Sequence, residues 1–255
     1  MRIDNYLANE KKYTSRTKAK EAVERGEVLV NGKIVKPSYE ICEKDVISFS
    51  DDALGFVSNG AFKLERAFEI FELNVEGKTV ADIGASTGGF TQSLLNHGAA
   101  RVFAVDVGES LLHPIIRDNP AVVVFDNTNA RFIDENTFGC KMDVVVSDVS
   151  FISLTYILQS IYKILSADGD AIVLVKPQFE CGPKALSKNG IVTDKKNRYL
   201  ACKNIVNFAE GVGFGAIGFT NAPIRQGKNV EFLLHLRKYC SSLVDEKALL
   251  SVCVG

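Results

Sequence analysis

The stretch that decides the fold is Val80-Ala81-Asp82-Ile83-Gly84-Ala85-Ser86-Thr87-Gly88-Gly89-Phe90. Its apolar, β-branched beginning predicts a strand, and the apolar residues that recur at helical spacing from Phe90 onward predict a helix. Between them, Gly84 allows a sharp turn, and Gly88-Gly89 allows a ligand to approach the backbone closely. A strand, a glycine-rich loop and a helix in this order predict a nucleotide-sized pocket.

The spacing of these glycines narrows the choice of ligand. The pattern is not Gly-x-Gly-x-x-Gly, which weakens a nicotinamide-type interpretation, and this loop contains no Gly-Lys-Ser/Thr, which excludes a triphosphate P-loop at this position. An acid two residues before the first glycine, followed by Gly-x-x-x-Gly, resembles the first motif of S-adenosylmethionine-dependent methyltransferases. The resemblance implies S-adenosylmethionine as the cofactor, bound by Asp82, Gly84, Ala85, Ser86, Gly88, Gly89 and Phe90. A plain tight turn, with Ser86 capping the helix, is the alternative.

The composition is that of a soluble globular protein. The 255 residues are 46% hydrophobic and 24% charged, with a net charge of −1, and they suit one substantial domain plus a small one. We find no membrane-spanning apolar run and no secretory signal at the start. The six cysteines are scattered without a Cys-x-x-Cys pair, which favours reduced thiols, a cytoplasmic location and no metal site.

The neutral net charge hides a basic beginning. Residues 1–36 contain nine Lys or Arg and five acids. A basic surface on a neutral protein suggests contact with a polyanion, although a solvated helix face would look the same. The pattern predicts two helices, the second from Ser15 through Glu24, and then short strands at 28–30, 33–35 and 45–49 joined by an Asn31-Gly32 turn.

The order of residues in this module carries a resemblance. The module contains, in order, Arg2-x-Asp4, Ser15-Arg16-x-Lys18-Ala19, Gly26-x-Val28-x-Val30-Asn31-Gly32 and Lys36-Pro37. This order of residues resembles the small α+β RNA-binding domain of ribosomal protein S-four, many pseudouridine synthases and tyrosyl-tRNA synthetases. The resemblance covers residues 1–52 and implies RNA phosphate contacts by Arg16, Lys18, Lys20 and Arg25. Arg2 is a further candidate for RNA contact, or it forms a structural pair with Asp4.

The rest of the chain alternates strand and helix. The polar and flexible segment 51–55 predicts a hinge that overlaps a linker at 53–60, before a domain at 61–245 and a C-terminal tail at 246–255. The expected strands are 79–82, 101–106, 122–125, 143–148, 171–176, 215–220 and 230–236, with helical patterns between them, such as 154–165 and 195–211. The pattern predicts an α/β fold, a Rossmann-like, doubly wound sheet of seven strands that binds ligands at the carboxyl ends of its strands.

Polar side chains follow several of these strands. Asp82 ends the first, and Asp106 ends the second, 22 residues after Gly84, where a carboxylate ordinarily binds a ribose diol. Asn129 follows the third strand within reach of an adenine edge, and Asp148 ends the fourth. Each could instead mark where the sheet meets water. Because several converge on one edge, we assign Asp106, Asn129 and Asp148 to the cofactor site.

Lys176, which ends the fifth strand, predicts acid–base chemistry. A lysine at the end of a buried strand loses solvation, and a second cation nearby makes its neutral form more accessible. Lys63, before the first strand, could supply that cation, while Asp148 and Glu231 could orient both lysines. Such a lysine could remove the proton from a sugar hydroxyl, and alignment of that hydroxyl with a methyl donor would supply much of the rate.

The catalytic candidates Lys63, Asp148, Lys176 and Glu231 match the Lys-Asp-Lys-Glu tetrad of FtsJ-type 2′-O-ribose methyltransferases. The chain also contains the segments Ser-Asp-Val-Ser-Phe-Ile-Ser-Leu, Leu-Val-Lys-Pro-Gln-Phe-Glu and Asn-Val-Glu-Phe-Leu-Leu-His-Leu. With the tetrad, these segments make it similar to the TlyA family, the rRNA 2′-O-methyltransferases long labelled hemolysins. The resemblance implies methylation of cytidine riboses in rRNA or ribosomal subunits. The chain departs from the family pattern at Asn59, Ala61, Glu109–Leu111 and Asp126-Asn127.

Two other classes of function stay open at this point. One is a non-catalytic RNA-binding factor in ribosome assembly with a vestigial pocket. The other is a membrane-lytic protein, which the short tail Leu243–Leu250 supports only weakly, so we expect no membrane partner. Oligomeric state is not predicted.

Overall fold

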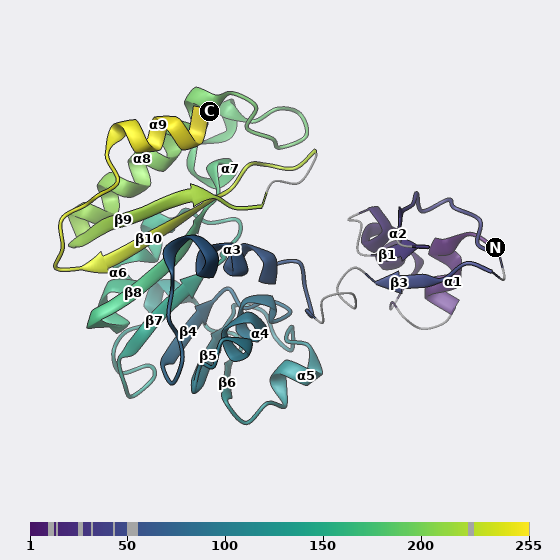
Figure 1. Ribbon diagram of the computed structural model, residues 1–255, viewed down its shortest axis with the longest axis horizontal. Coiled ribbons are helices and arrows are strands. Elements are labelled where there is room, and N and C mark those ends of the chain that lie inside the picture. The colour runs from purple at the N-terminus through teal and green to yellow at the C-terminus, as the bar shows by residue number, and fades with distance from the viewer. Residues whose placement is uncertain are drawn as a thin grey trace. The chain divides into compact units, whose positions relative to one another are not determined.

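The computed structural model describes residues 1–9, 13, 15–24, 28–31, 33–42, 44–49, 56–223 and 227–254. They form two compact units, Met1–Val57 and Ser58–Gly255, which Figure 1 colours along the chain. The division between the units falls inside the predicted linker 53–60. The predicted hinge at 51–55 lies outside the described residues.

The small unit contains the predicted helices and short strands. Helices α1 (Ile3–Asn9) and α2 (Arg16–Glu24) precede strands β1 (Val28–Val30), β2 (Lys33–Ile34) and β3 (Ile47–Phe49). The strands pair antiparallel in the order β2-β1-β3. The Ser15 hydroxyl accepts a hydrogen bond from the Lys18 backbone N–H at 3.2 Å, so Ser15 caps α2 as predicted. The core consists of Ile3, Leu7, Ala19, Ala22, Val23, Val28 and Val30.

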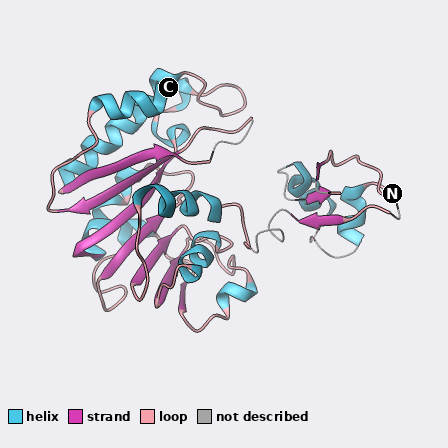
Figure 2. Cartoon of the chain, viewed as in Figure 1, coloured by secondary structure: helices cyan, strands magenta, loops and turns pink. Residues whose placement is uncertain are grey.

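The large unit is built on a seven-stranded sheet (Figure 2). Its strands are β4 (Thr79–Ile83), β5 (Arg101–Val105), β6 (Val122–Phe125), β7 (Met142–Ser147), β8 (Leu165–Val175), β9 (Phe214–Asn221) and β10 (Phe232–Lys238). They are ordered β6-β5-β4-β7-β8-β10-β9, and only β10 runs antiparallel to its neighbours. All seven predicted strands are therefore present, and the carboxyl ends of β4 to β8 meet at one edge.

Helices cover both faces of this sheet. They are α3 (Ala61–Phe71), α4 (Gly89–Asn96), α5 (Pro114–Arg117), α6 (Leu158–Ile164), α7 (Pro177–Glu180), α8 (Lys195–Val212) and α9 (Glu246–Val254), with short 3-10 helices η1 (Ala130–Phe132), η2 (Leu154–Tyr156) and η3 (Pro183–Ala185). Alternate strand residues pack on opposite faces: Val80 lies in the cluster with α3 and α4, and Ala81 lies in the cluster with α6, α8 and α9. This alternation confirms the doubly wound α/β fold.

Three elements differ from the prediction by more than two residues. The helix expected at 154–165 is a 3-10 turn followed by α6, because the Ser153 side chain accepts a hydrogen bond from the Thr155 N–H and starts a tighter turn. Strand β8 begins at Leu165, well before the predicted residue 171. Residues of the predicted C-terminal tail form α9, which packs Leu249 and Cys253 into the core. Among the helices that the structure describes, none is long and apolar enough to cross a membrane.

Candidate active site

The glycine-rich loop lies where β4 meets α4. The N–H groups of Gly84 and Ala85 donate to the Val105 carbonyl at 2.8 and 3.1 Å, which ties the loop to the end of β5. Gly84 has a φ of +86°, and a Cβ there would lie 3.1 Å from the backbone oxygen of Asp148. Glycine is therefore required where the loop passes the end of β7.

The structure gives the later loop residues packing roles. A Cβ on Gly89 would overlap the Ser58 hydroxyl oxygen, so the segment before α3 lies directly against the beginning of α4. Ala85 and Phe90 are buried, and Phe90 packs in the core with α3. Gly88 has a φ of +96°, and Ser86 adopts a left-handed conformation. These contacts and backbone angles explain the shape of the loop, and the cofactor contacts of these residues stay predictions.

Asp82 and Asp106 lie on either side of this loop. Asp82 is fully buried; its Oδ2 accepts a hydrogen bond from the Thr91 hydroxyl at 2.7 Å, and its Oδ1 has no partner among the described residues. Burial raises the pKa of Asp82 to about 7. The half-buried Asp106 accepts the Ser86 N–H at 2.8 Å and the Gly108 N–H at 2.9 Å.

Asn129 occupies the position at which η1 begins. Its Oδ1 accepts a hydrogen bond from the Arg131 N–H at 3.1 Å, so it caps the 3-10 helix. The residue is exposed beyond the end of β6. A capping role leaves the side-chain amide N–H groups available, and the predicted contact with an adenine edge stays a prediction.

The four predicted catalytic side chains form one cluster in the large unit. Asp148 lies between the two lysines: its Oδ1 is 2.7 Å from Lys176 Nζ, and its Oδ2 is 3.0 Å from Lys63 Nζ. Glu231 Oε2 lies 2.9 Å from Lys63 Nζ. The side chains of Lys63, Asp148, Lys176 and Glu231 are 22, 16, 8 and 18% exposed. The four side chains thus come together from the ends of β7 and β8, the first turn of α3 and the residue before β10.

The charges in this cluster balance. Burial alone would lower the pKa of Lys63, but the carboxylates of Asp148 and Glu231 raise it more, so Lys63 holds its proton firmly. Burial alone would raise the pKa of Asp148, but the two lysines lower it more, so Asp148 stays ionised. Lys63 and Asp148 therefore stay a charged pair beside Lys176.

Sequence reasoning missed two polar residues that contact the tetrad, Ser150 and Gln178, and a third polar residue, Glu180, in the segment after Lys176. The Ser150 hydroxyl accepts a hydrogen bond from Lys176 Nζ at 2.7 Å. Gln178 Nε2 donates to Glu231 Oε1 at 3.1 Å. Glu180 accepts hydrogen bonds from the Ser153 hydroxyl at 2.6 Å and the Leu154 N–H at 2.9 Å. All lie within the sequence segments 147–154 and 174–180 around Asp148 and Lys176, but the sequence of these segments does not reveal which groups the side chains contact.

Two departures from the family pattern contact each other. Asp126 Oδ2 accepts the Ser110 N–H at 3.0 Å and an Arg117 Nη2 hydrogen bond at 3.1 Å. Asp126 thus accepts a hydrogen bond from the altered segment 109–111. The two departures form one local arrangement beside the end of β5.

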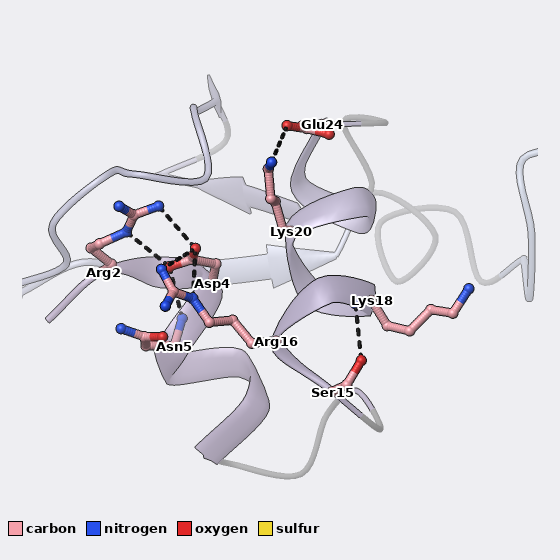
Figure 3. Close-up of polar contacts among 8 residues, drawn as sticks. All are labelled: Arg2, Asp4, Asn5, Ser15, Arg16, Lys18, Lys20 and Glu24. Atoms are coloured by element: carbon pink, nitrogen blue, oxygen red, sulfur yellow. Dashed lines mark hydrogen bonds and ion pairs between the residues drawn. The ribbon is translucent and has the colours of Figure 1, made fainter.

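The predicted RNA-binding residues of the small unit fall into two groups. Arg2 and Arg16 both contact the buried carboxylate of Asp4, at 2.9 and 3.2 Å (Figure 3). Lys18 pairs with Glu21 at 3.3 Å, and Lys20 pairs with Glu24 at 3.6 Å. The structural pair expected between Arg2 and Asp4 is present. Arg25 lies outside the described residues.

Known families match both units. The FtsJ-like methyltransferase family matches residues 56–239, and the S4 domain matches residues 1–47. With the seven-stranded sheet and the site at its edge, these matches define the large unit as an FtsJ-like methyltransferase and the small unit as an S4 domain.

Individual relatives extend over nearly the whole chain. The 16S/23S rRNA (cytidine-2′-O)-methyltransferase TlyA of Mycobacterium tuberculosis is 37% identical over 97% of this chain and 94% of that protein. Hemolysin A of Brachyspira hyodysenteriae is 40% identical over 92% of this chain and 99% of its own. A solved structure from Streptococcus thermophilus that carries the name hemolysin has a TM-score of 0.81 at 35% identity, covering 100% of this chain and 94% of that one. The chain belongs to the TlyA family of methyltransferases.

Proposed function

We propose that this protein transfers a methyl group from S-adenosylmethionine to the 2′-hydroxyl of a cytidine in rRNA, in the cytoplasm. The observation that carries the proposal is the Asp148 carboxylate between Lys63 and Lys176, beside the glycine-rich loop. The TlyA proteins of Mycobacterium tuberculosis and Campylobacter jejuni are both rRNA (cytidine-2′-O)-methyltransferases, which supports the choice of substrate.

The residues around the loop fit S-adenosylmethionine, which supplies an electrophilic methyl group on a sulfonium. The buried Oδ1 of Asp82 lacks a partner among the described residues, as expected of an acceptor held for a bound group. The Asp106 carboxylate, fixed by two backbone N–H groups, has acceptor capacity left for ribose hydroxyls. Gly84 and Gly88 would shape the backbone around the cofactor, and Asn129 would reach its base.

Lys176 is the general base in this proposal. Asp148 Oδ1 and Ser150 Oγ hold its Nζ in place, so that Nζ can accept the proton of the 2′-hydroxyl as the hydroxyl oxygen attacks the methyl carbon. Lys63 stays protonated between Asp148 and Glu231, which fixes the carboxylate that orients Lys176. The chain's contribution is alignment together with removal of one proton.

Substitution of Lys176 tests the proposal. Lys176→Ala should lower methyl incorporation into rRNA by about 100-fold or more, because the general base is lost. Lys176→Arg should fail equally, because a guanidinium keeps its proton. Incorporation is measured with radiolabelled S-adenosylmethionine, and cofactor affinity by calorimetry.

The exposed Lys184 provides a matched control. Lys184→Ala and Lys184→Arg should methylate like the wild type, and the Lys176 variants should still bind the cofactor. Unchanged incorporation in Lys176→Ala would contradict the proposal. Failure of the wild-type protein to bind S-adenosylmethionine would instead favour a non-catalytic assembly factor.

A further inference from the structure

A cavity of about 630 Å³ lies in the large unit, away from the tetrad. The two elements that carry Lys63 and Glu231 reach it with their other ends: Phe71 ends α3, and Arg237 lies near the end of β10. Six residues of extended chain separate Glu231 from Arg237, which corresponds to roughly 20 Å. The cavity is therefore separate from the groups assigned to methyl transfer.

The walls of this cavity are apolar. They come from α3, β9 and the segment after β10, and consist of Ile70, Phe71, Ile217 and Leu243. The Phe71 ring lies directly on the backbone of β9, because a Cβ on Gly218 would be 2.7 Å from it. The same ring packs against His235, with the ring centroids 5.3 Å apart. Glycine at position 218 thus makes room for one wall, and the volume is that of an ordinary small-molecule site.

Three charged or polar side chains form the other end of the cavity. Asp170 Oδ1 accepts hydrogen bonds from His235 Nε2 at 2.7 Å and from Arg237 Nε and Nη2 at 2.9 and 2.7 Å. The side chains of Asp170 and His235 are 11 and 8% exposed, and that of Arg237 is 45% exposed. Burial alone would raise the pKa of Asp170, but the hydrogen bonds from His235 and Arg237 lower it more. An ionised, buried carboxylate therefore fixes the Arg237 guanidinium in one orientation.

The outer edge of that guanidinium remains available. Arg237 has five N–H donors in a planar fork, and its Nη1 has no partner among the described residues. Nη1 and the second N–H of Nη2 form an edge that matches the two oxygens of a carboxylate. The Ser241 hydroxyl lines the same cavity, and none of the described residues that line it is acidic. A fixed cationic edge thus stands beside apolar walls.

We propose that this cavity binds a small organic carboxylate with an apolar or aromatic body. The carboxylate accepts hydrogen bonds from Arg237 and Ser241, and the body packs against Phe71 and Ile217. Asp170 positions Arg237 and does not itself line the cavity. A neutral amide of the same shape fills the same space but forgoes the charge-assisted hydrogen bonds, which are about twice as strong as neutral ones.

Dansylglycine is a suitable probe, because its fluorescence increases in apolar surroundings. Titration of the full-length protein should give saturable binding at one site, and dansylglycinamide should bind about tenfold more weakly. Saturating S-adenosylmethionine should leave the affinity for dansylglycine unchanged, because the cavity is separate from the tetrad. The absence of saturable binding, equal affinity for the amide, or displacement by S-adenosylmethionine would each overturn the proposal.

Two variants test the location of the probe. Leu243→Glu places a carboxylate at an exposed position of the cavity wall and should weaken dansylglycine binding about tenfold. The matched control Leu250→Glu, at an exposed position of α9 outside the cavity, should bind like the wild type.

Arg237→Lys keeps the charge but loses the planar fork, and should weaken binding severalfold. Leu243→Glu changes an exposed side chain, so it decides the matter even if Arg237→Lys does not fold, as checked by circular dichroism. Wild-type affinity in Leu243→Glu, or an equal loss in Leu250→Glu, would overturn the proposal.

Discussion

Each unit of this protein places one carboxylate between two cations, but the two clusters differ in the kind of cation and in its exposure. In the large unit, Asp148 joins Lys63 and Lys176, whose side chains are mostly buried. In the small unit, Asp4 joins Arg2 and Arg16, whose side chains reach solvent. A lysine can give up its proton, whereas an arginine cannot. The comparison suggests that the same arrangement serves proton transfer in one unit and anion binding in the other.

A third carboxylate shows what the cations contribute. Asp82 is as buried as Asp4, but its side chain accepts a hydrogen bond from the Thr91 hydroxyl, and no cation pairs with it among the described residues. Burial raises the pKa of Asp82 to about 7, while the paired cations hold the pKa of Asp4 and Asp148 below the ordinary value. Cations thus decide which of these carboxylates are charged at neutral pH.

Removing the central carboxylate should affect the two clusters unequally. Asp148→Asn leaves two buried lysines facing each other and should lower the free energy of unfolding by about 3 kcal/mol. Asp4→Asn should cost about 1 kcal/mol, because water can solvate the exposed arginines. Urea unfolding, followed separately for each unit, measures both. Equal losses would remove the distinction between the clusters.

The pH dependence of stability should separate Asp82 from the paired carboxylates. Its folded pKa of about 7 lies above the unfolded value of about 3.9, so its contribution is fully present below pH ~4 and is lost as the pH rises through ~7. Asp82→Asn should therefore gain stability relative to the wild type over this range, as measured by thermal unfolding. Thr91→Val should strengthen the trend, since the Thr91 hydrogen bond lowers the pKa. A difference that does not vary with pH would contradict this assignment.

The smallest effects are expected at the helix-surface pairs. Lys18→Gln and Lys20→Gln each break one exposed ion pair of α2 and should lower the free energy of unfolding by about 0.3–0.5 kcal/mol. The loss should shrink further in high salt, because the pairs are screened. A loss as large as that of Asp4→Asn, measured by urea unfolding, would mean that exposure is not what separates these pairs from the buried clusters.

Local sequence patterns were sufficient to predict most of the fold. Continuous apolar runs located all seven strands of the large sheet, and the Asn31-Gly32 and Ser15 signals located the turn and cap of the small unit. The predicted boundaries of helices and strands were wrong where a side-chain hydrogen bond, or packing against an element distant in sequence, decides where the element begins or ends. The Ser153 hydrogen bond replaces one helical turn, and α9 becomes part of the core through contacts with α8 that no local pattern encodes.

The candidate site was predicted in outline. Charged strand ends indicated Asp148 and Lys176. Lys63 and Glu231 were candidates for a second cation and an orienting carboxylate, and the family resemblance grouped all four, although 85 residues separate Lys63 from Asp148. Sequence could not show that Asp148 contacts both lysines, that Ser150 and Gln178 complete the cluster, or that Arg16 shares Asp4 with Arg2. Such contacts depend on how elements distant in sequence pack together.

The most direct test of the central claim is a map of 2′-O-methyl groups in rRNA. Ribosomal RNA would be compared between cells that carry the wild-type protein and cells that carry Lys176→Ala at the same level. We predict at least one 2′-O-methylcytidine that is present with the wild type and absent with the variant. Identical maps would contradict the assignment of Lys176 and its cluster to methyl transfer.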